Sequence, residues 1–201
     1  KTAYEMLRSL VGSEMCIRDR DSEFSEERYL SRYNSDLAND LGNLLSRVLT
    51  MLNRGLGGVI PSPEVEQELE TELWKLWDAT LEETLELYSG FQFHTGLEKV
   101  FYFIGSINRY AEQRAPWKLA KSDDEEDIKL LNTTLFVMSE ALRLAVGLVE
   151  PVMPETKGKV YGLLGYESDA EWKVRLVRAT DLAGNKVGGK TILFPKPQND
   201  S

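Results

Sequence analysis

Apolar residues recur at intervals of three and four along most of the chain, which is the period of an amphipathic α-helix. From Asp21 onward, stretches rich in Gly and Pro divide this pattern into segments of helical length. The pattern predicts helices over about 24–54, 64–88, 97–114, 123–150 and 154–165. The first predicted helix has a candidate break at Asn34 and Ser35, where Ser35 can act as the N-cap of a new helical segment.

Local start and stop signals set the boundaries of these segments. Ser62 followed by Pro63 predicts that the second helix begins at Glu64. Pro116 disfavours helix at Ala115, and the acidic run 123–127 is typical of the start of the next helix. That helix is apolar nearly all round, so we expect it at the centre of the bundle.

The segment beyond residue 165 alternates only weakly between apolar and polar residues and carries several glycines. The sequence therefore predicts an all-α fold, an antiparallel helical bundle over 21–165. An irregular or weakly β C-terminal arm over 166–201 is expected to pack on it. Trp74, Trp77 and Trp172 are interpreted as core or partly buried aromatic residues.

The amino-acid composition excludes several kinds of site and function for this bundle. The chain has 201 residues, a formal net charge of −9, one cysteine (Cys16) and one histidine (His94). Disulfides and cysteine-bound metals are therefore excluded from residue 21 onward. No apolar run approaches the roughly 18 residues that a membrane span needs. The charge argues against a generally basic nucleic-acid binder, although it leaves room for local basic patches.

No catalytic motif is visible in the sequence. It lacks a glycine-rich phosphate loop, a catalytic-triad pattern and metal-ligand spacing. We therefore assign no catalytic residue and no metal ligand. His94, in "GFQFHTG", is interpreted as an ordinary loop or helix-start residue.

Two short stretches of the chain resemble a known protein family. They are "RYNSDLANDLGNLLSR", which contains Asn43 and Arg47, and "NRYAEQRAPWKLAK", which contains Trp117. Together they resemble the anticodon-binding helical domain of the methionyl-tRNA synthetases, a family of class I aminoacyl-tRNA synthetases. The similarity continues in order through "LRLAVGLVEPVMPET", "YGLLG" and "LFPK", from about 21 to 196.

The resemblance implies that Asn43, Arg47 and Trp117 recognise the CAU anticodon of methionine tRNA, with Trp117 stacking on its first base. Elementary chemistry agrees with these roles. Asn43 and Arg47 are four residues apart and share one helix face. An amide can read a base edge, a guanidinium offers a planar fork, and a tryptophan held by a proline makes a rigid stacking platform.

Supporting tRNA contacts are expected from Pro116, Arg54, Arg109, Arg114, Lys118 and Lys121, and the five cations among them would form a local positive patch for phosphates. Each proposed base reader also has a structural interpretation. Arg47 is equally able to be a surface arginine paired with Asp40 or another carboxylate. Asn43 can be an ordinary helix residue, and Trp117 a core aromatic.

The family resemblance also has implications for the whole enzyme, which attaches methionine to its tRNA using ATP and magnesium. Its catalytic domain precedes the bundle, and neither of its two signature motifs occurs here. The expectation is thus an inactive, cytoplasmic fragment that needs no cofactor and binds no DNA or membrane. Its partners would be methionine tRNA and the catalytic domain. The alternatives are a sister synthetase for Val, Leu, Ile or Cys, or a helical protein-interaction module.

The first twenty residues have a different character. "VGSEMCIRDR" can be back-translated as GTG GGC TCG GAG ATG TGT ATA AGA GAC AGN, which resembles a sequencing-library adapter. "KTAYE" can be back-translated as the index-side adapter of the same system, in frame. We therefore expect 1–20 to be translated adapter DNA and not part of the native protein.

Overall fold

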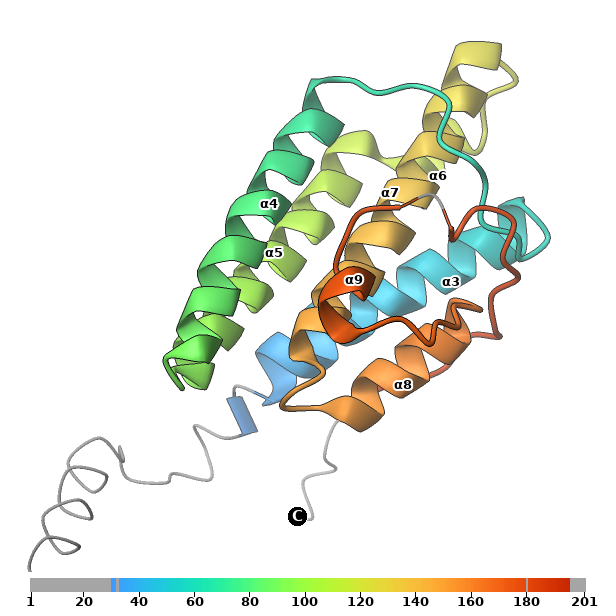
Figure 1. Ribbon diagram of the computed structural model, residues 1–201. Coiled ribbons are helices and arrows are strands. Elements are labelled where there is room, and N and C mark those ends of the chain that lie inside the picture. The colour runs from blue at the N-terminus through green and yellow to red at the C-terminus, as the bar shows by residue number, and fades with distance from the viewer. Residues whose placement is uncertain (1–29, 32, 180, 196–201) are drawn as a thin grey trace, which may run out of the picture.

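The computed structural model describes residues 30–31, 33–179 and 181–195 (Figure 1). The predicted start of the first helix and the adapter-like segment both lie outside this part of the chain. The elements are a π-helix η1 (Tyr33–Gly42) and the α-helices α3 (Asn43–Gly55), α4 (Glu68–Ser89), α5 (Phe93–Arg114), α6 (Pro116–Leu119), α7 (Glu125–Val149), α8 (Pro154–Leu163) and α9 (Trp172–Arg175).

The architecture is a helical bundle, as predicted. Helices α4 and α5 form a long antiparallel hairpin, and α7 runs beside it through the middle of the molecule (Figure 1). The apolar faces of α3, α4, α5 and α8 all contribute to one core with α7. Every residue of α7 from Thr133 to Val149 is buried, which confirms its predicted central position.

The start of α4 differs from the prediction. The helix begins at Glu68, four residues later than expected, with a capping box between Gln67 and Glu70. The backbone N–H groups of Glu64 and Val65 instead donate to Thr133 Oγ1, at 2.9 and 3.0 Å. This tertiary contact satisfies donors that a helix would otherwise leave unpaired, so the segment stays extended across α7.

Other boundaries follow local signals more closely. Helix α7 starts within the acidic run, as predicted, and Asp124 caps it by accepting from the N–H groups of Glu126 and Asp127. Helix α5 begins at Phe93, four residues before the expected 97, because the ring of Phe93 packs 5.1 Å from that of Tyr88. His94 is therefore an exposed residue in the first turn of α5.

The arm lies against α7 and α8 (Figure 1). The arm was predicted to be irregular or weakly β, and it contains one helical turn, α9, at Trp172–Arg175. The Trp172 indole N–H donates to the Gly147 carbonyl at 2.8 Å, and this bond orients the turn. Among the described residues, strand-like pairing is limited to one isolated antiparallel bridge between Val59 and Lys186.

A buried ion pair on α7 holds the arm. Arg143 and Glu140 are each 2% exposed and bond to each other at 2.6 Å. Arg143 also donates to the carbonyls of Arg175 and Val177, and Glu140 accepts from the N–H of Ala179. Buried charges require such complete pairing. We call this group the Glu140–Arg143 clasp.

The expectation that no apolar run approaches the length of a membrane span was wrong for α7, which would be able to cross a membrane by length and composition alone. However, 94% of the relevant window is buried inside the bundle, as in the core helix of many proteins. The apolar character of α7 is thus accounted for by packing.

Candidate functional site

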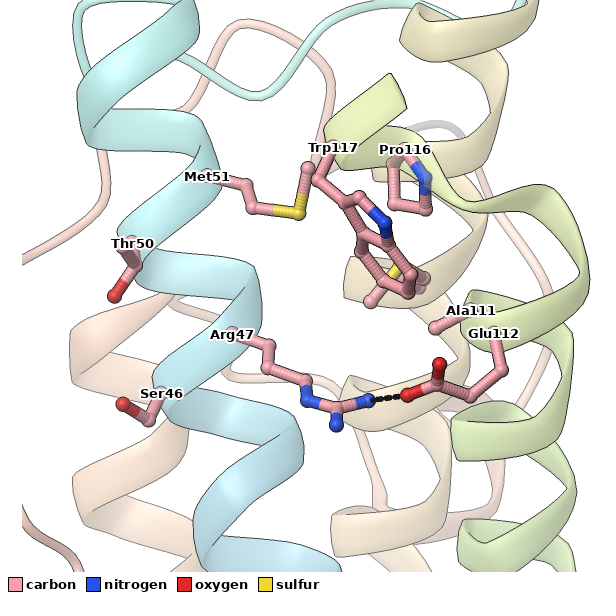
Figure 2. A pocket seen from close by; sticks show the side chains of 9 residues that line it. Ser46, Arg47, Thr50, Met51, Ala111, Glu112, Pro116 and Trp117 are labelled. Carbon is pink, nitrogen blue, oxygen red and sulfur yellow. Dashed lines mark hydrogen bonds and ion pairs between the residues drawn. The ribbon is translucent and has the colours of Figure 1, made fainter. Parts of the chain in front are cut away.

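A cavity of about 440 Å³ opens between α3, the end of α5 and α6 (Figure 2). Its lining combines apolar side chains with a few polar groups, which is the composition of many ligand sites. The lining residues are Ser46, Arg47, Thr50, Met51, Ala111, Glu112, Pro116, Trp117 and Met138. Two of the three predicted base readers, Arg47 and Trp117, therefore line the same cavity.

Arg47 reaches from α3 across the cavity edge toward α5 (Figure 2). Its Nη1 lies 2.6 Å from Oε1 of Glu112, and the side chains are 44% and 56% exposed. The alternative prediction, a pair between Arg47 and some carboxylate, is therefore correct, with Glu112 in place of Asp40. Because the pair is solvated, its Coulomb energy is small, and a competing anion or base edge can replace Glu112 at low cost.

Trp117 stands at the opposite side of the cavity from this ion pair (Figure 2). The chain reverses at Ala115, which has φ +44° in the left-handed region, and Pro116 then begins α6 as its first residue. This agrees with the predicted exclusion of Ala115 from the helix. Pro116 is buried, whereas Trp117 remains 40% exposed. The indole is thus anchored on one side and accessible on the other.

Asn43 lies one turn before Arg47 at the start of α3 and is exposed. It shares the helix face of Arg47, as the spacing predicted, but it does not line the cavity. An elongated ligand that filled the cavity and extended along α3 would contact both side chains.

The remaining predicted cations occupy three different settings. Arg54, Lys118 and Lys121 are exposed, and Lys118 directly follows Trp117. Arg109 donates to Ser106 at 2.8 Å and lies over the Tyr102 ring at 5.4 Å. The side chain of Arg114 is 9% exposed and is bound to Glu70 on α4.

The sequence reading missed part of this site. Thr50 and Met51 follow from the helical period, since they are three and four residues after Arg47 on α3, whereas the adjacent Ser46 does not. Glu112 and Met138 had no comparable signal, because they lie on other helices. Trp77 is 1% exposed, and both Trp74 and Trp172 are largely covered, which confirms their predicted structural roles.

No group of three or more His, Cys, Asp or Glu side chains suited to a metal ion occurs among the described residues. Nothing in this part of the chain resembles a phosphate-binding glycine loop either. We therefore assign no step of metal or nucleotide chemistry to these residues.

Curated proteins that are similar to this chain in sequence include methionine–tRNA ligases. The chain is 39% identical to the methionine–tRNA ligase of Mycobacterium leprae over 150 residues, which cover 75% of this chain and 28% of that protein. It is 38% identical to the corresponding ligase of Deinococcus radiodurans over 184 residues, 89% of this chain and 26% of that protein. No family model matches the chain.

Solved structures agree with these sequence matches. The apo form of Mycobacterium tuberculosis methionyl-tRNA synthetase superposes with a TM-score of 0.82 at 35% identity, over 87% of this chain and 35% of that one. The same synthetase bound by methionyl-adenylate gives a TM-score of 0.81 at 35% identity, over 86% of this chain and 34% of that one. The chain thus spans about a third of the length of its relatives. By sequence and by fold, it is a relative of the methionine–tRNA ligases over that third.

Proposed function

We propose that this chain is the anticodon-binding part of a methionine–tRNA ligase and that it recognises the CAU anticodon of methionine tRNA. The observation that carries the proposal is the convergence of Arg47 and Trp117 on one cavity, with Asn43 one turn away on the same helix face. Three side chain types that suit unstacked bases are thereby gathered on one surface.

In this proposal the first anticodon base stacks on the exposed face of Trp117. Single-stranded RNA loops present splayed bases, which proteins recognise by stacking and by contacts with base edges. Met51 and Met138 line the same cavity, so the base would leave water for an apolar surface. Arg47 would exchange Glu112 for the RNA, and Asn43 would bond a neighbouring base edge.

The net charge of −9 opposes a polyanion at long range, so local charge has to compensate. Lys118 and Lys121 are exposed near Trp117, and Arg54 is exposed near the end of α3. We assign these cations to phosphate contacts, which strengthen binding without reading sequence. The affinity should therefore fall as salt rises.

The parent enzyme, in this proposal, is a cytoplasmic ligase that joins methionine to its tRNA with ATP and magnesium. That chemistry would take place in a catalytic domain that is not part of this bundle. The bundle would contribute tRNA selection, and by itself it would not activate methionine.

Titration of the 201-residue chain with fluorescent anticodon stem-loops tests the proposal. One stem-loop carries CAU, and a matched one differs only in its first anticodon base. We expect tighter binding of CAU at moderate salt. Further stem-loops carry valine, leucine, isoleucine and cysteine anticodons, and preference for one of these would indicate a sister synthetase. Equal or absent binding of all stem-loops would contradict an anticodon-binding role.

A further inference from the structure

A second buried group of charges lies directly before the Trp117 platform. Glu70, in the first turn of α4, is fully buried and accepts from the backbone N–H of Gln67 at 3.0 Å. Its carboxylate also accepts from the Tyr110 hydroxyl at 2.5 Å and from two guanidinium nitrogens of Arg114, at 2.8 and 2.5 Å. We call these four residues the Glu70–Arg114 clasp.

Arg114 joins the ends of two helices through this clasp. It is the last residue of α5, and its third bond, from Nη1 to Gln67 Oε1 at 2.8 Å, reaches the N-cap of α4. A guanidinium that uses three nitrogens on two fixed acceptors has its position and orientation determined. The end of α5 is therefore attached to the start of α4 at one point.

The backbone changes direction immediately after this point. Ala115 takes the left-handed conformation with φ +44°, which is uncommon for a residue other than glycine. Pro116 then restricts the next φ angle, and Trp117 follows. Such strained positions persist only where the surroundings over-determine them. Ala115 lies between two fixed residues, Arg114 in the Glu70–Arg114 clasp and the buried Pro116.

We propose that the Glu70–Arg114 clasp is a positioning device for Trp117, and that Arg114 acts on RNA binding through Trp117 and not by contacting a phosphate. This inference rests on the proposed function for its RNA readout. Its structural basis is independent of RNA, since all three guanidinium nitrogens of Arg114 already donate to Glu70 or Gln67.

The first test removes the whole clasp in the double variant Glu70→Gln plus Arg114→Met. Removing both charges leaves no unpaired buried ion, so folding should survive. The matched control, Glu140→Gln plus Arg143→Met, removes the other buried clasp, which holds the arm. Should the first variant fail to fold, Arg114→Lys keeps the charge and loses the fork, and it is measured in its place.

The RNA readout is a double-mutant cycle with Trp117→Ala. With Trp117 present, loss of the Glu70–Arg114 clasp is expected to weaken CAU stem-loop binding about tenfold, as for directly coupled residues. With Trp117 replaced by Ala, the same loss should change binding less than about twofold. Loss of the Glu140–Arg143 clasp should leave CAU stem-loop binding unchanged, both with Trp117 present and with Trp117 replaced by Ala.

An equal effect in both backgrounds would overturn the inference. If that effect came with a salt dependence reduced by about one phosphate contact, Arg114 would instead be a direct phosphate ligand.

A spectroscopic readout separates this inference from the proposed function. The chain has four tryptophans, so fluorotryptophan labelling yields a small set of ¹⁹F signals, and Trp117→Phe assigns the one of interest. Loss of the Glu70–Arg114 clasp should shift or broaden the Trp117 signal in the absence of RNA. Loss of the Glu140–Arg143 clasp should instead change the ¹⁹F signal of Trp172. An unchanged Trp117 signal would contradict the positioning role, whereas failure of CAU discrimination with an altered signal would contradict only the anticodon proposal.

Discussion

Arg47 on α3 and Glu112 on α5 are 65 positions apart in sequence, yet their side chains meet at 2.6 Å along one edge of the cavity. The pair is solvated, so it contributes little to folding. Its consequence is electrostatic, because a carboxylate neutralises the cation that we assign to RNA binding. This relationship sets up a competition between Glu112 and an incoming RNA for Arg47.

Glu112→Gln is therefore expected to tighten stem-loop binding, since it frees Arg47 and removes a negative charge beside the RNA. The free energy of unfolding should change by less than about 1 kcal/mol. Fluorescence anisotropy and urea unfolding measure the two quantities. Glu83→Gln is the matched control, because it breaks a similarly exposed pair with Lys99 on the α4–α5 hairpin and makes the same change in net charge. An equal gain in both variants would show that only net charge matters.

Trp117→Ala should weaken the CAU complex by about 1–3 kcal/mol, which is the usual contribution of a stacked base. Anisotropy titration measures the loss. Trp172→Ala is the comparison, because Trp172 packs the arm through its bond to Gly147. That variant should lower the free energy of unfolding and leave the affinity of the folded protein unchanged. A similar loss of affinity in both variants would speak against stacking on Trp117.

Gly96→Ala should destabilise the α4–α5 hairpin. An added Cβ at Gly96 would lie 2.4 Å from Cε1 of Tyr88, so the buried Tyr88 ring or the helix that carries it would have to move. Overpacking of this kind costs about 1–3 kcal/mol. Gly105→Ala on the same helix meets no atom within 4 Å and should instead stabilise by about 0.5–1 kcal/mol through helix propensity. Urea unfolding of the pair distinguishes packing from propensity, and equal effects would refute the close approach.

Acid should destabilise the protein in part through Glu70. Burial alone would raise the pKa of Glu70, but hydrogen bonds from Arg114, Tyr110 and the Gln67 backbone outweigh it and lower that pKa. A carboxylate with a lowered folded-state pKa stabilises the fold above its unfolded value, near 4.5, and loses this contribution as the pH falls through the folded value.

Urea unfolding between pH 7 and pH 3 measures this loss. Below about pH 4.5 the wild-type curve should fall more steeply than that of the Glu70→Gln plus Arg114→Met variant, which has no carboxylate to protonate at this site. Parallel curves would assign the acid sensitivity to other carboxylates, such as Glu150, whose pKa is also lowered by its partners Arg175 and Lys157 against the effect of burial.

The helical periodicity, and with it the bundle, follows from the order of apolar and polar residues alone. The start of α7 in the acidic run 123–127 and the exclusion of Ala115 from the helix before Pro116 were also predicted. These features depend on contacts within a few residues, which the order of side chains specifies directly. The family resemblance, carried by short motifs around Asn43, Arg47 and Trp117, was also readable from the chain alone and agrees with the relatives found.

Which side chains meet across helices depends on how the helices pack, and the sequence pattern did not predict it. Thr133 holds the segment before α4 extended, so that helix starts later than its proline signal predicted. Glu112 pairs with Arg47. Arg114, expected among the phosphate-binding surface cations, forms a buried ion pair with Glu70 instead. Such partners are set by packing of elements distant in sequence, where periodicity specifies a face but not its neighbour.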